Sequence, residues 1–189
     1  MSGHSKWSQI RHKKAITDAK KGNLFSKMVR EITIAARTGL PAGKAGDPNP
    51  DANIRLKATV ERARSIGVPK DNIDRAIAKA SGQGDGSELF EFLYEAAAPS
   101  GVAILIEGIT DNKNRTFNEI KHLLSKHDAR LVNPGSLLWA FEKTWTASAG
   151  HVYKPRSPRG QPNRLPSLEA LLSAISEHDD VQEVYTNLA

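Results

Sequence analysis

The spacing of hydrophobic residues changes at a short glycine-rich segment, and this change most constrains what the chain can fold into. Before that segment, apolar residues such as Phe25, Ile32 and Leu56 recur at the spacing of amphipathic helices. Residues 81–87 read SGQGDGS, a composition typical of a flexible linker. After it, residues 102–109 read VAILIEGI, a run typical of a buried strand. The sequence therefore predicts an α+β protein with an all-helical domain over 1–80, a linker over 81–87, and a sheet-containing domain beyond.

The helical domain is expected to contain several short helices. Residues 6–21 are compatible with a helix, although their many cations leave no continuous apolar stripe. Asn23 is expected to cap a second helix. A third helix is expected over about residues 51–65, with Gly67 as the glycine that terminates it. A fourth helix is expected to begin near Pro69.

The second domain is expected to be a ferredoxin-like split β-α-β sandwich formed by residues 88–143 and 167–189. Strands are predicted over 89–97, 102–109, around 130–132, 137–142 and 181–187. Helices are predicted after a cap within residues 110–115, extending through residues 117–127, and over 167–176. In the first of these helices, one inward face is expected to hold Phe117, Ile120, Leu123/Leu124 and His127.

Residues 144–166 separate the two parts of this domain. They contain four prolines, three arginines and one lysine, with no hydrophobic periodicity. This composition predicts a disordered or extended connection without regular secondary structure.

Charge is distributed unevenly along the chain. The first thirty residues hold eight Lys/Arg against a single acid, Asp18. Residues 1–85 carry 17 Lys/Arg and 8 Asp/Glu, a net charge of +9, whereas residues 86–189 carry 10 and 13, a net charge of −3. The basic charge of the first thirty residues predicts a polyanionic partner. Trp7, which lies among these cations, is suited to stacking on nucleic-acid bases. The alternative is a solvated basic arm that only aids solubility. The candidate nucleic-acid contacts are Lys6, Trp7, Arg11, His12, Lys13, Lys14, Lys20, Lys27, Arg30, Lys70 and Arg75.

Several classes of protein are disfavoured by what the sequence lacks. Without cysteine, disulfides and thiolate metal sites are excluded. The six histidines show none of the helical i, i+4 spacing that a helix-borne zinc site needs, and no serine stands in a nucleophile-elbow pattern. No catalytic residue, metal, cofactor or small-molecule substrate is therefore predicted. No apolar run approaches the ~20 residues that span a bilayer, and no secretory signal opens the chain, so a cytoplasmic location is expected.

A polar run, TDNKNRT at residues 110–116, lies between a predicted strand and a predicted helix. Asp111 or Asn112 can cap the helix by accepting a backbone hydrogen bond. Asn112, Asn114 and Arg115 can also form an anion or partner site at the helix N-terminus. Both interpretations stay open at this point, since they can hold together.

Several runs in the chain resemble the YebC family, which includes bacterial proteins described as transcriptional regulators and a mitochondrial translational activator of cytochrome c oxidase. They are GHSKW (3–7), IRHKK (10–14), NIRL (53–56), PKDNI (69–73), TDN (110–112), SKH (125–127) and DDVQEVYTN (179–187). Relatives usually carry a third, α/β domain where this chain has residues 144–166, so the chain looks like a shortened member.

This resemblance implies a non-enzymatic regulator of gene expression that binds DNA. It also implies two alternatives: a translational activator that contacts the ribosome and its RNA, and a module that docks on RNA polymerase or a ribosomal protein. For an organelle-targeted member, the expected location is the mitochondrial matrix.

Overall fold

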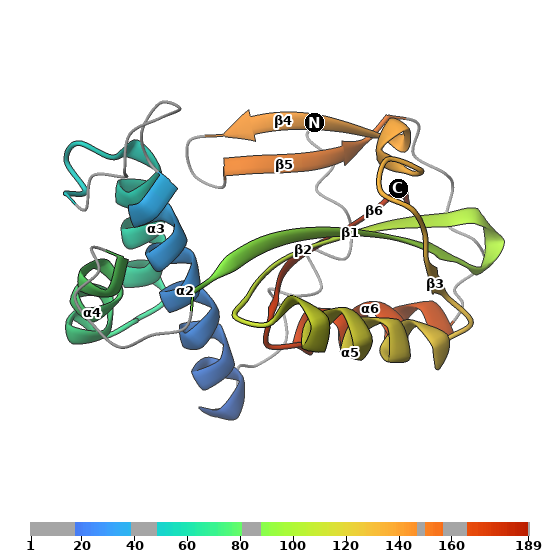
Figure 1. The fold of residues 1–189 in the computed structure, drawn as a ribbon, viewed down its shortest axis with the longest axis horizontal. Helices are drawn as coiled ribbons and strands as arrows, with labels where there is room; N and C mark the ends of the chain where they lie inside the picture. Colours follow the sequence, from blue (N-terminus) through green and yellow to red (C-terminus); the bar gives the residue numbers. More distant parts are fainter. Residues whose placement is uncertain (1–17, 39–48, 81–87, 147–149, 157–165, 189) are drawn as a thin grey trace. The chain divides into compact units, whose positions relative to one another are not determined.

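The computed structural model describes residues 18–38, 49–80, 88–146, 150–156 and 166–188. They fall into two compact units, which are described separately (Figure 1). The helical unit contains the described residues up to Phe90 together with those between Trp145 and Val152. The α+β unit contains the others. Among the described residues, no helix is both long and apolar enough to cross a membrane.

The helical unit is built from three helices around one apolar core. They are α2 (Asp18–Thr38), α3 (Ile54–Ser65) and α4 (Lys70–Ala80). The core consists of Met28, Ile32, Ala35, Ala36, Leu56, Val60, Ala63, Val68, Ile73 and Ala76. The alanines let the helix backbones approach closely, while the larger side chains fill the space between them.

A buried asparagine joins two of these helices. Asn53 is fully buried and caps α3, because its Oδ1 accepts a hydrogen bond of 2.9 Å from the backbone N–H of Leu56. Its Nδ2 donates to the carbonyl of Ala35 in α2, also at 2.9 Å. The predicted terminator Gly67 follows α3 with a φ of +86°, a conformation that glycine adopts without strain.

One predicted helix boundary is wrong. Asn23 was expected to begin a helix, but it lies inside α2, which starts at Asp18. Gly22 and Asn23 both have modest helix propensity, at a cost of about 1 kcal/mol for the glycine. Packing of the apolar face of α2 against α3 and α4 offsets that cost, so the helix continues through both residues.

The α+β unit confirms the predicted sandwich. Its four-stranded sheet has the order β3-β1-β2-β6, in which β1 pairs with β3 and β2 pairs with β6 in antiparallel orientation. The strands are β1 (Phe90–Ala98), β2 (Val102–Thr110), β3 (Arg130–Leu131) and β6 (Val181–Thr186). Helices α5 (Lys113–Ser125) and α6 (Pro166–Glu177) cover one face (Figure 1). Because β2, α5 and β3 follow one another while β1 lies between the two strands, they form the predicted split β-α-β unit.

Alternate residues of β2 face two different cores. Val102, Ile104 and Ile106 pack with the helices α5 and α6. Ala103 and Leu105 pack on the opposite face with Phe141 and Tyr153. This explains why β2 reads as a continuous apolar run, since both of its faces are covered.

The prediction for residues 144–166 is wrong in its described part. Phe141 and Tyr153 belong to a hairpin of β4 (Phe141–Thr146) and β5 (Gly150–Pro155). The strand predicted over 137–142 also begins later, since a short 3-10 turn occupies Leu138–Ala140. The hairpin is stabilised by tertiary contacts, because Phe141 and Tyr153 pack against Ala103 and Leu105 on the sheet face opposite the helices. Such contacts leave no periodic pattern in the local sequence from which the strands could be predicted.

The predicted inward face of α5 needs one correction. Ile120 and Leu124 are fully buried as expected, but Phe117 is 41% exposed. Thr116, which is also fully buried, takes the inward position one turn before Ile120. A polar residue can do so here because its hydroxyl has buried partners, which are described below.

Candidate functional site

The helical unit carries an excess of positive charge. Its segments 18–38 and 49–80 contain twelve Lys/Arg and six Asp/Glu. Lys70 and Arg75 are exposed on α4, and Lys27 and Arg30 are half-buried on α2. Lys20 lies in α2, but its side chain is outside the described residues, as are Lys6, Trp7, Arg11, His12, Lys13 and Lys14.

The contacts of these cations determine how much charge remains for a ligand. Arg62 of α3 forms an ion pair with Glu31 of α2. Arg75 instead donates to neutral acceptors, the side-chain oxygen of Asn72 at 2.6 Å and the carbonyl of Asp71 at 3.1 Å. Neutral partners orient the guanidinium without cancelling its charge. Arg75 therefore remains a candidate phosphate contact.

Two further cations of this unit, Lys57 and Arg64, are exposed but are not among the predicted nucleic-acid contacts. Lys57 and Arg64 are both exposed and lie seven residues apart on α3, which places them on one edge of that helix. Their spacing was the signal that could have identified them. It is weak by itself, because charged residues at helical spacing usually form an ordinary solvated face.

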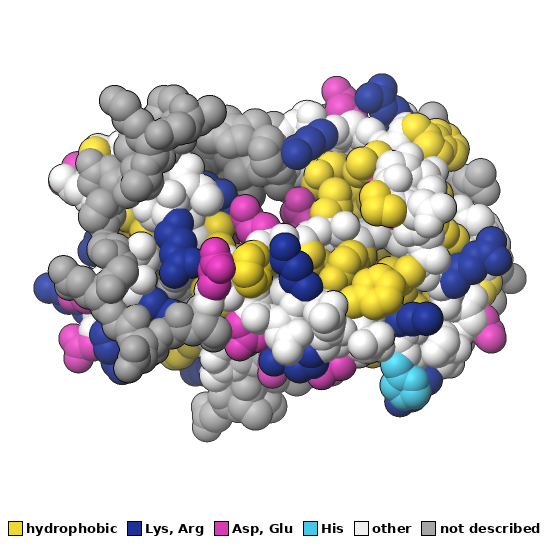
Figure 2. All heavy atoms as spheres, viewed as in Figure 1, with side chains coloured by type: hydrophobic (Ala, Val, Ile, Leu, Met, Phe, Trp, Pro, Cys, Tyr) yellow, Lys and Arg dark blue, Asp and Glu magenta, His cyan; other side chains and the backbone are white. Residues whose placement is uncertain are grey.

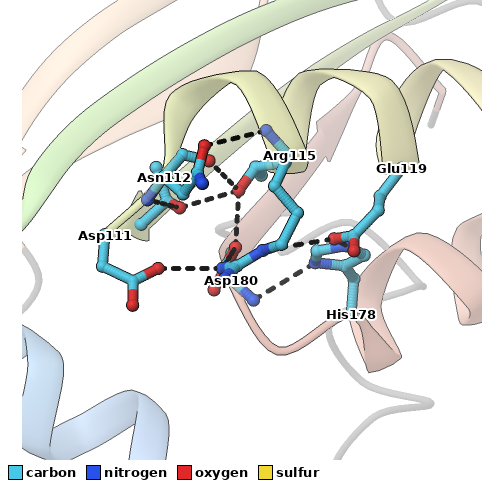
Figure 3. A network of polar contacts seen from close by, with 8 residues as sticks. Asp111, Asn112, Arg115, Glu119, His178 and Asp180 are labelled. Carbon is cyan, nitrogen blue, oxygen red and sulfur yellow. Dashed lines mark hydrogen bonds and ion pairs between the residues drawn. The ribbon is translucent and has the colours of Figure 1, made fainter.

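The α+β unit contains a polar network where β2, α5 and β6 meet (Figure 3). Asn112 caps α5, because its Oδ1 accepts from the backbone N–H of Arg115 at 3.0 Å. The guanidinium of Arg115 donates through Nη2 to Asp111 at 2.9 Å and to Asp180 at 2.8 Å. These contacts, the one to Asp180 above all, raise the pKa of Arg115 further.

Asp180 is the centre of this network. Its side chain is only 2% exposed, and Oδ2 accepts from Thr116 Oγ1 at 2.6 Å as well as from Arg115. Thr116 also lies 2.7 Å from the hydroxyl of Thr110, which accepts from the N–H of Asn112 at 2.9 Å. Because a carboxylate only accepts, the hydroxyl protons align from Thr110 through Thr116 to Asp180. Asp180, although it is one of two adjacent acids before a strand, is therefore a buried acceptor and not part of a solvated turn.

His178 and Glu119 extend the network toward the surface. His178 Nδ1 accepts from the N–H of Asp180 at 3.2 Å, so the neutral ring carries its proton on Nε2. Nε2 lies 3.1 Å from Glu119 Oε2. The candidate ligand atoms of Glu119, His178 and Asp180 all lie within 4.8 Å of one another, a distance that a metal ion could bridge. Arg115 already supplies the positive charge there, and both nitrogens of His178 are engaged, so the arrangement is better suited to a structural role than to a metal site.

The predicted anion or partner site at the start of α5 is only partly assembled here. The oxygen of Asn112 is used in the cap, and Arg115 forms ion pairs with the three carboxylates of Asp111, Glu119 and Asp180. Asn114 is exposed at the second position of the helix. The cap interpretation is observed directly, and the binding role of these residues stays a prediction.

A half-buried carboxyl group, that of Glu107, lies on the other face of the same sheet. Glu107 is an acid in the middle of the apolar strand β2, and this exception in the run was the signal for it. Its pKa is raised to about 7, chiefly by burial and also by the charge of the opposing Glu183, while the hydrogen bond from Tyr185 and the charge of Lys143 act in the lowering direction. Tyr185 Oη donates to Glu107 at 3.3 Å, and burial raises the pKa of the tyrosine as well.

The pKa of Glu107 predicts how stability depends on pH. An acid whose pKa is higher in the folded than in the unfolded protein stabilises the fold when the pH is below its pKa in the unfolded chain, which is near 4.5. That stabilisation is lost as the pH rises through about 7. Glu107→Gln, which mimics the protonated acid, should therefore be more stable than the unmutated protein at pH 8 by roughly 2 kcal/mol. Urea titrations of both proteins at pH 5 and pH 8 measure this, and an equal difference at the two pH values would contradict it.

Two family profiles and several curated bacterial proteins match the sequence of this chain. The profile described as "TACO1/YebC protein N-terminal domain" matches residues 5–83, and that described as "TACO1/YebC second and third domain" matches residues 89–151. A "Probable transcriptional regulatory protein" of Desulfosudis oleivorans is 41% identical over 189 residues, covering 100% of this chain and 72% of the relative. One of Thermosipho melanesiensis is 50% identical over 143 residues, covering 76% of this chain and 54% of the relative.

A solved structure resembles the whole fold. It is the crystal structure of a conserved hypothetical protein from Aquifex aeolicus, with a TM-score of 0.84 at 30% sequence identity. The match covers 98% of this chain and 97% of that one. Against the curated relatives, by contrast, the chain spans between about half and three quarters of their length.

Proposed function

Because the chain belongs to the TACO1/YebC family, we propose that it is a non-enzymatic nucleic-acid-binding regulator of gene expression. Its curated relatives are named probable transcriptional regulatory proteins, which supports a regulator. Under this proposal the ligand is DNA, and the helical unit with the preceding basic segment contacts its phosphates. The protein acts in the cytoplasm and uses no cofactor.

The observation that carries this proposal is the position of positive charge on the helical unit. Its core is formed by apolar residues, so its cations lie at the surface, where Lys70 and Arg75 are exposed. With twelve Lys/Arg against six Asp/Glu, half of this positive charge has no acidic counterpart in the same segments. Surface cations of this kind displace counterions from a phosphate backbone, which is the main source of sequence-independent affinity.

The test is reversal of charge on α4. We expect Lys70→Glu with Arg75→Glu to weaken binding to a short duplex DNA by about tenfold, and to lower the slope of log K against log salt by about 2. Fluorescence anisotropy at salt concentrations between about 50 and 200 mM measures both quantities. The matched control is Lys126→Glu with Lys154→Glu, two exposed lysines of the α+β unit, which should leave duplex binding nearly unchanged.

Equal losses in the two double variants would mean that net charge, not the helical unit, governs binding. Loss of binding in neither variant would remove α4 from the interface. The same assay on Arg11→Glu, Lys13→Glu and Lys14→Glu together tests the basic segment that precedes α2. Retained affinity in that variant would exclude these three residues as phosphate contacts.

The second candidate function is translational activation through ribosomal RNA. It predicts the same basic surface, and the ligand distinguishes it, since an RNA-binding protein should prefer structured RNA over duplex DNA at equal salt. Competition between the two nucleic acids in the anisotropy assay decides which is the ligand. The third candidate, a module that docks on the transcription or translation machinery, predicts that partner capture survives removal of residues 1–22.

A further inference from the structure

An exposed aromatic side chain on α5 is held in place by two others. Phe117 is 41% exposed, and its ring meets Tyr94 of β1 in an edge-to-face contact with 5.7 Å between centroids. Tyr94 in turn stacks on Phe92, at 4.5 Å between centroids. Phe92 and Tyr94 are half-buried, so they anchor Phe117 to the sheet while its ring remains accessible. Figure 2 shows hydrophobic side chains gathered on this face, with Lys and Arg side chains around them.

Polar and cationic residues flank Phe117 along the helix. Lys113 and Lys121 lie four residues before and after it, and Asn114 lies three residues before it. All three are exposed, and such spacings place side chains next to each other on a helix surface. In the described part of the chain, no carboxylate forms an ion pair with Lys121. Arg115, by contrast, is held by Asp111 and Asp180, so its charge is locally compensated.

Positive charge is concentrated here although the unit as a whole is acidic. Residues 113–131 contain five Lys/Arg and two Asp/Glu, whereas residues 86–189 contain 10 and 13. The α5 surface, defined as Lys113, Asn114, Phe117 and Lys121, therefore combines an aromatic ring, an amide and two cations within a locally basic segment.

We infer that the α5 surface binds single-stranded nucleic acid by stacking an unpaired base on the ring of Phe117. This inference rests on the proposed function, and it adds a second contact, on the other unit, that selects unpaired bases. Bases in a duplex are stacked on each other and cannot reach a side-chain ring, whereas a single strand can. Lys113 and Lys121 lie where the adjoining phosphates would run, and the amide of Asn114 can hydrogen-bond a base edge.

Stacking and phosphate contacts differ in their response to salt, and the experiment uses this difference. Binding of labelled oligouridylate to the full-length chain is measured by anisotropy over a range of salt concentrations. We expect Phe117→Leu, which keeps an apolar side chain but removes the π-face, to weaken binding by about five- to a hundredfold with little change in the salt slope. Lys121→Glu should instead reduce the slope by about 1. Duplex DNA binding should be unchanged in Phe117→Leu.

Two controls keep the result specific. Trp139→Leu removes an aromatic residue of the same unit that is 69% exposed but lies outside α5, and it should bind as the unmutated protein does. An oligomer with abasic sites should bind the unmutated chain as weakly as the intact oligomer binds Phe117→Leu. Near-unchanged urea unfolding of Phe117→Leu confirms that the variant is folded.

Unchanged oligouridylate affinity in Phe117→Leu would overturn the inference, while loss of duplex binding on charge reversal in α4 would leave the proposed function intact. Failure of the unmutated chain to bind either nucleic acid would overturn both. If Phe117→Leu and Lys121→Glu keep oligouridylate binding but lose binding to polyglutamate, the inference is also overturned. The α5 surface would then be assigned to an acidic protein partner.

Discussion

Gly108→Ala is expected to lower the free energy of unfolding of the α+β unit by about 4 kcal/mol. A Cβ atom at this position would lie 2.2 Å from the carbonyl oxygen of Asp180 and 2.2 Å from the ring of Phe92. Both distances are far below van der Waals contact. The carbonyl cannot move aside cheaply, because it accepts a hydrogen bond of 2.8 Å from the N–H of Ile109.

The local geometry explains why the strand needs glycine here. The pairing of β2 with β6 is irregular between Glu107 and Gly108, and the absence of a side chain lets the turn that carries Asp180 approach the strand. The ring of Phe92 covers the glycine from β1. A methyl group would separate β2 from the Asp180 carbonyl and the Phe92 ring together.

Urea unfolding followed by circular dichroism measures this loss. Gly22→Ala is a matched control with the opposite sign, since Gly22 is a helical glycine and an added Cβ there would have no neighbour within 4 Å outside its own stretch of helix. It should stabilise the helical unit by up to about 1 kcal/mol. If Gly108→Ala unfolds at the same urea concentration as the unmutated protein, the close approach of Asp180 is not a constraint.

The second large effect is expected at Asp180. Asp180→Ala should destabilise the α+β unit by about 3 kcal/mol, because it leaves the guanidinium of Arg115 and the buried hydroxyl of Thr116 without their common acceptor. The estimate lies at the lower end for a broken ion pair, since the side chain of Arg115 is 42% exposed and water can solvate it.

Two comparisons isolate the cause of that loss. Asp180→Asn keeps a hydrogen-bond acceptor but removes the charge, so its cost should be smaller than that of alanine. Asp179→Ala removes the neighbouring carboxylate, which is exposed, and should change stability by less than about 0.5 kcal/mol. Similar losses at positions 179 and 180 would show that the buried network is not the source of the effect.

The network at Asp180 also shows where inference from sequence stopped. A cap at Asp111 or Asn112 was predictable, because a polar run follows a strand and precedes an amphipathic helix, and the structure assigns it to Asn112. Asp180 was not, since its partners Arg115 and Thr116 lie more than sixty residues away along the chain. No spacing rule connects positions so distant in sequence.

Phe117 illustrates a related limit. Helical periodicity assigned it to the inward face of α5 together with Ile120 and Leu124, and those two are buried. Periodicity fixes which residues share a stripe, but the angle at which a helix docks determines where the stripe ends. Here Thr116 is buried and donates to Asp180, whereas Phe117 lies at the exposed edge of the stripe.

The amino-acid sequence by itself determined the helical and α+β units, most strand positions, the glycine that ends α3 and the uneven distribution of charge. These properties depend on neighbours within one or two turns of the chain, so local periodicity and composition record them. Only the tertiary structure decided the burial of Asp180, the exposure of Phe117, the β4–β5 hairpin and the elevated pKa of Glu107. Each of these arises from contacts between segments far apart in the chain, and burial and desolvation exist only once those segments have packed together.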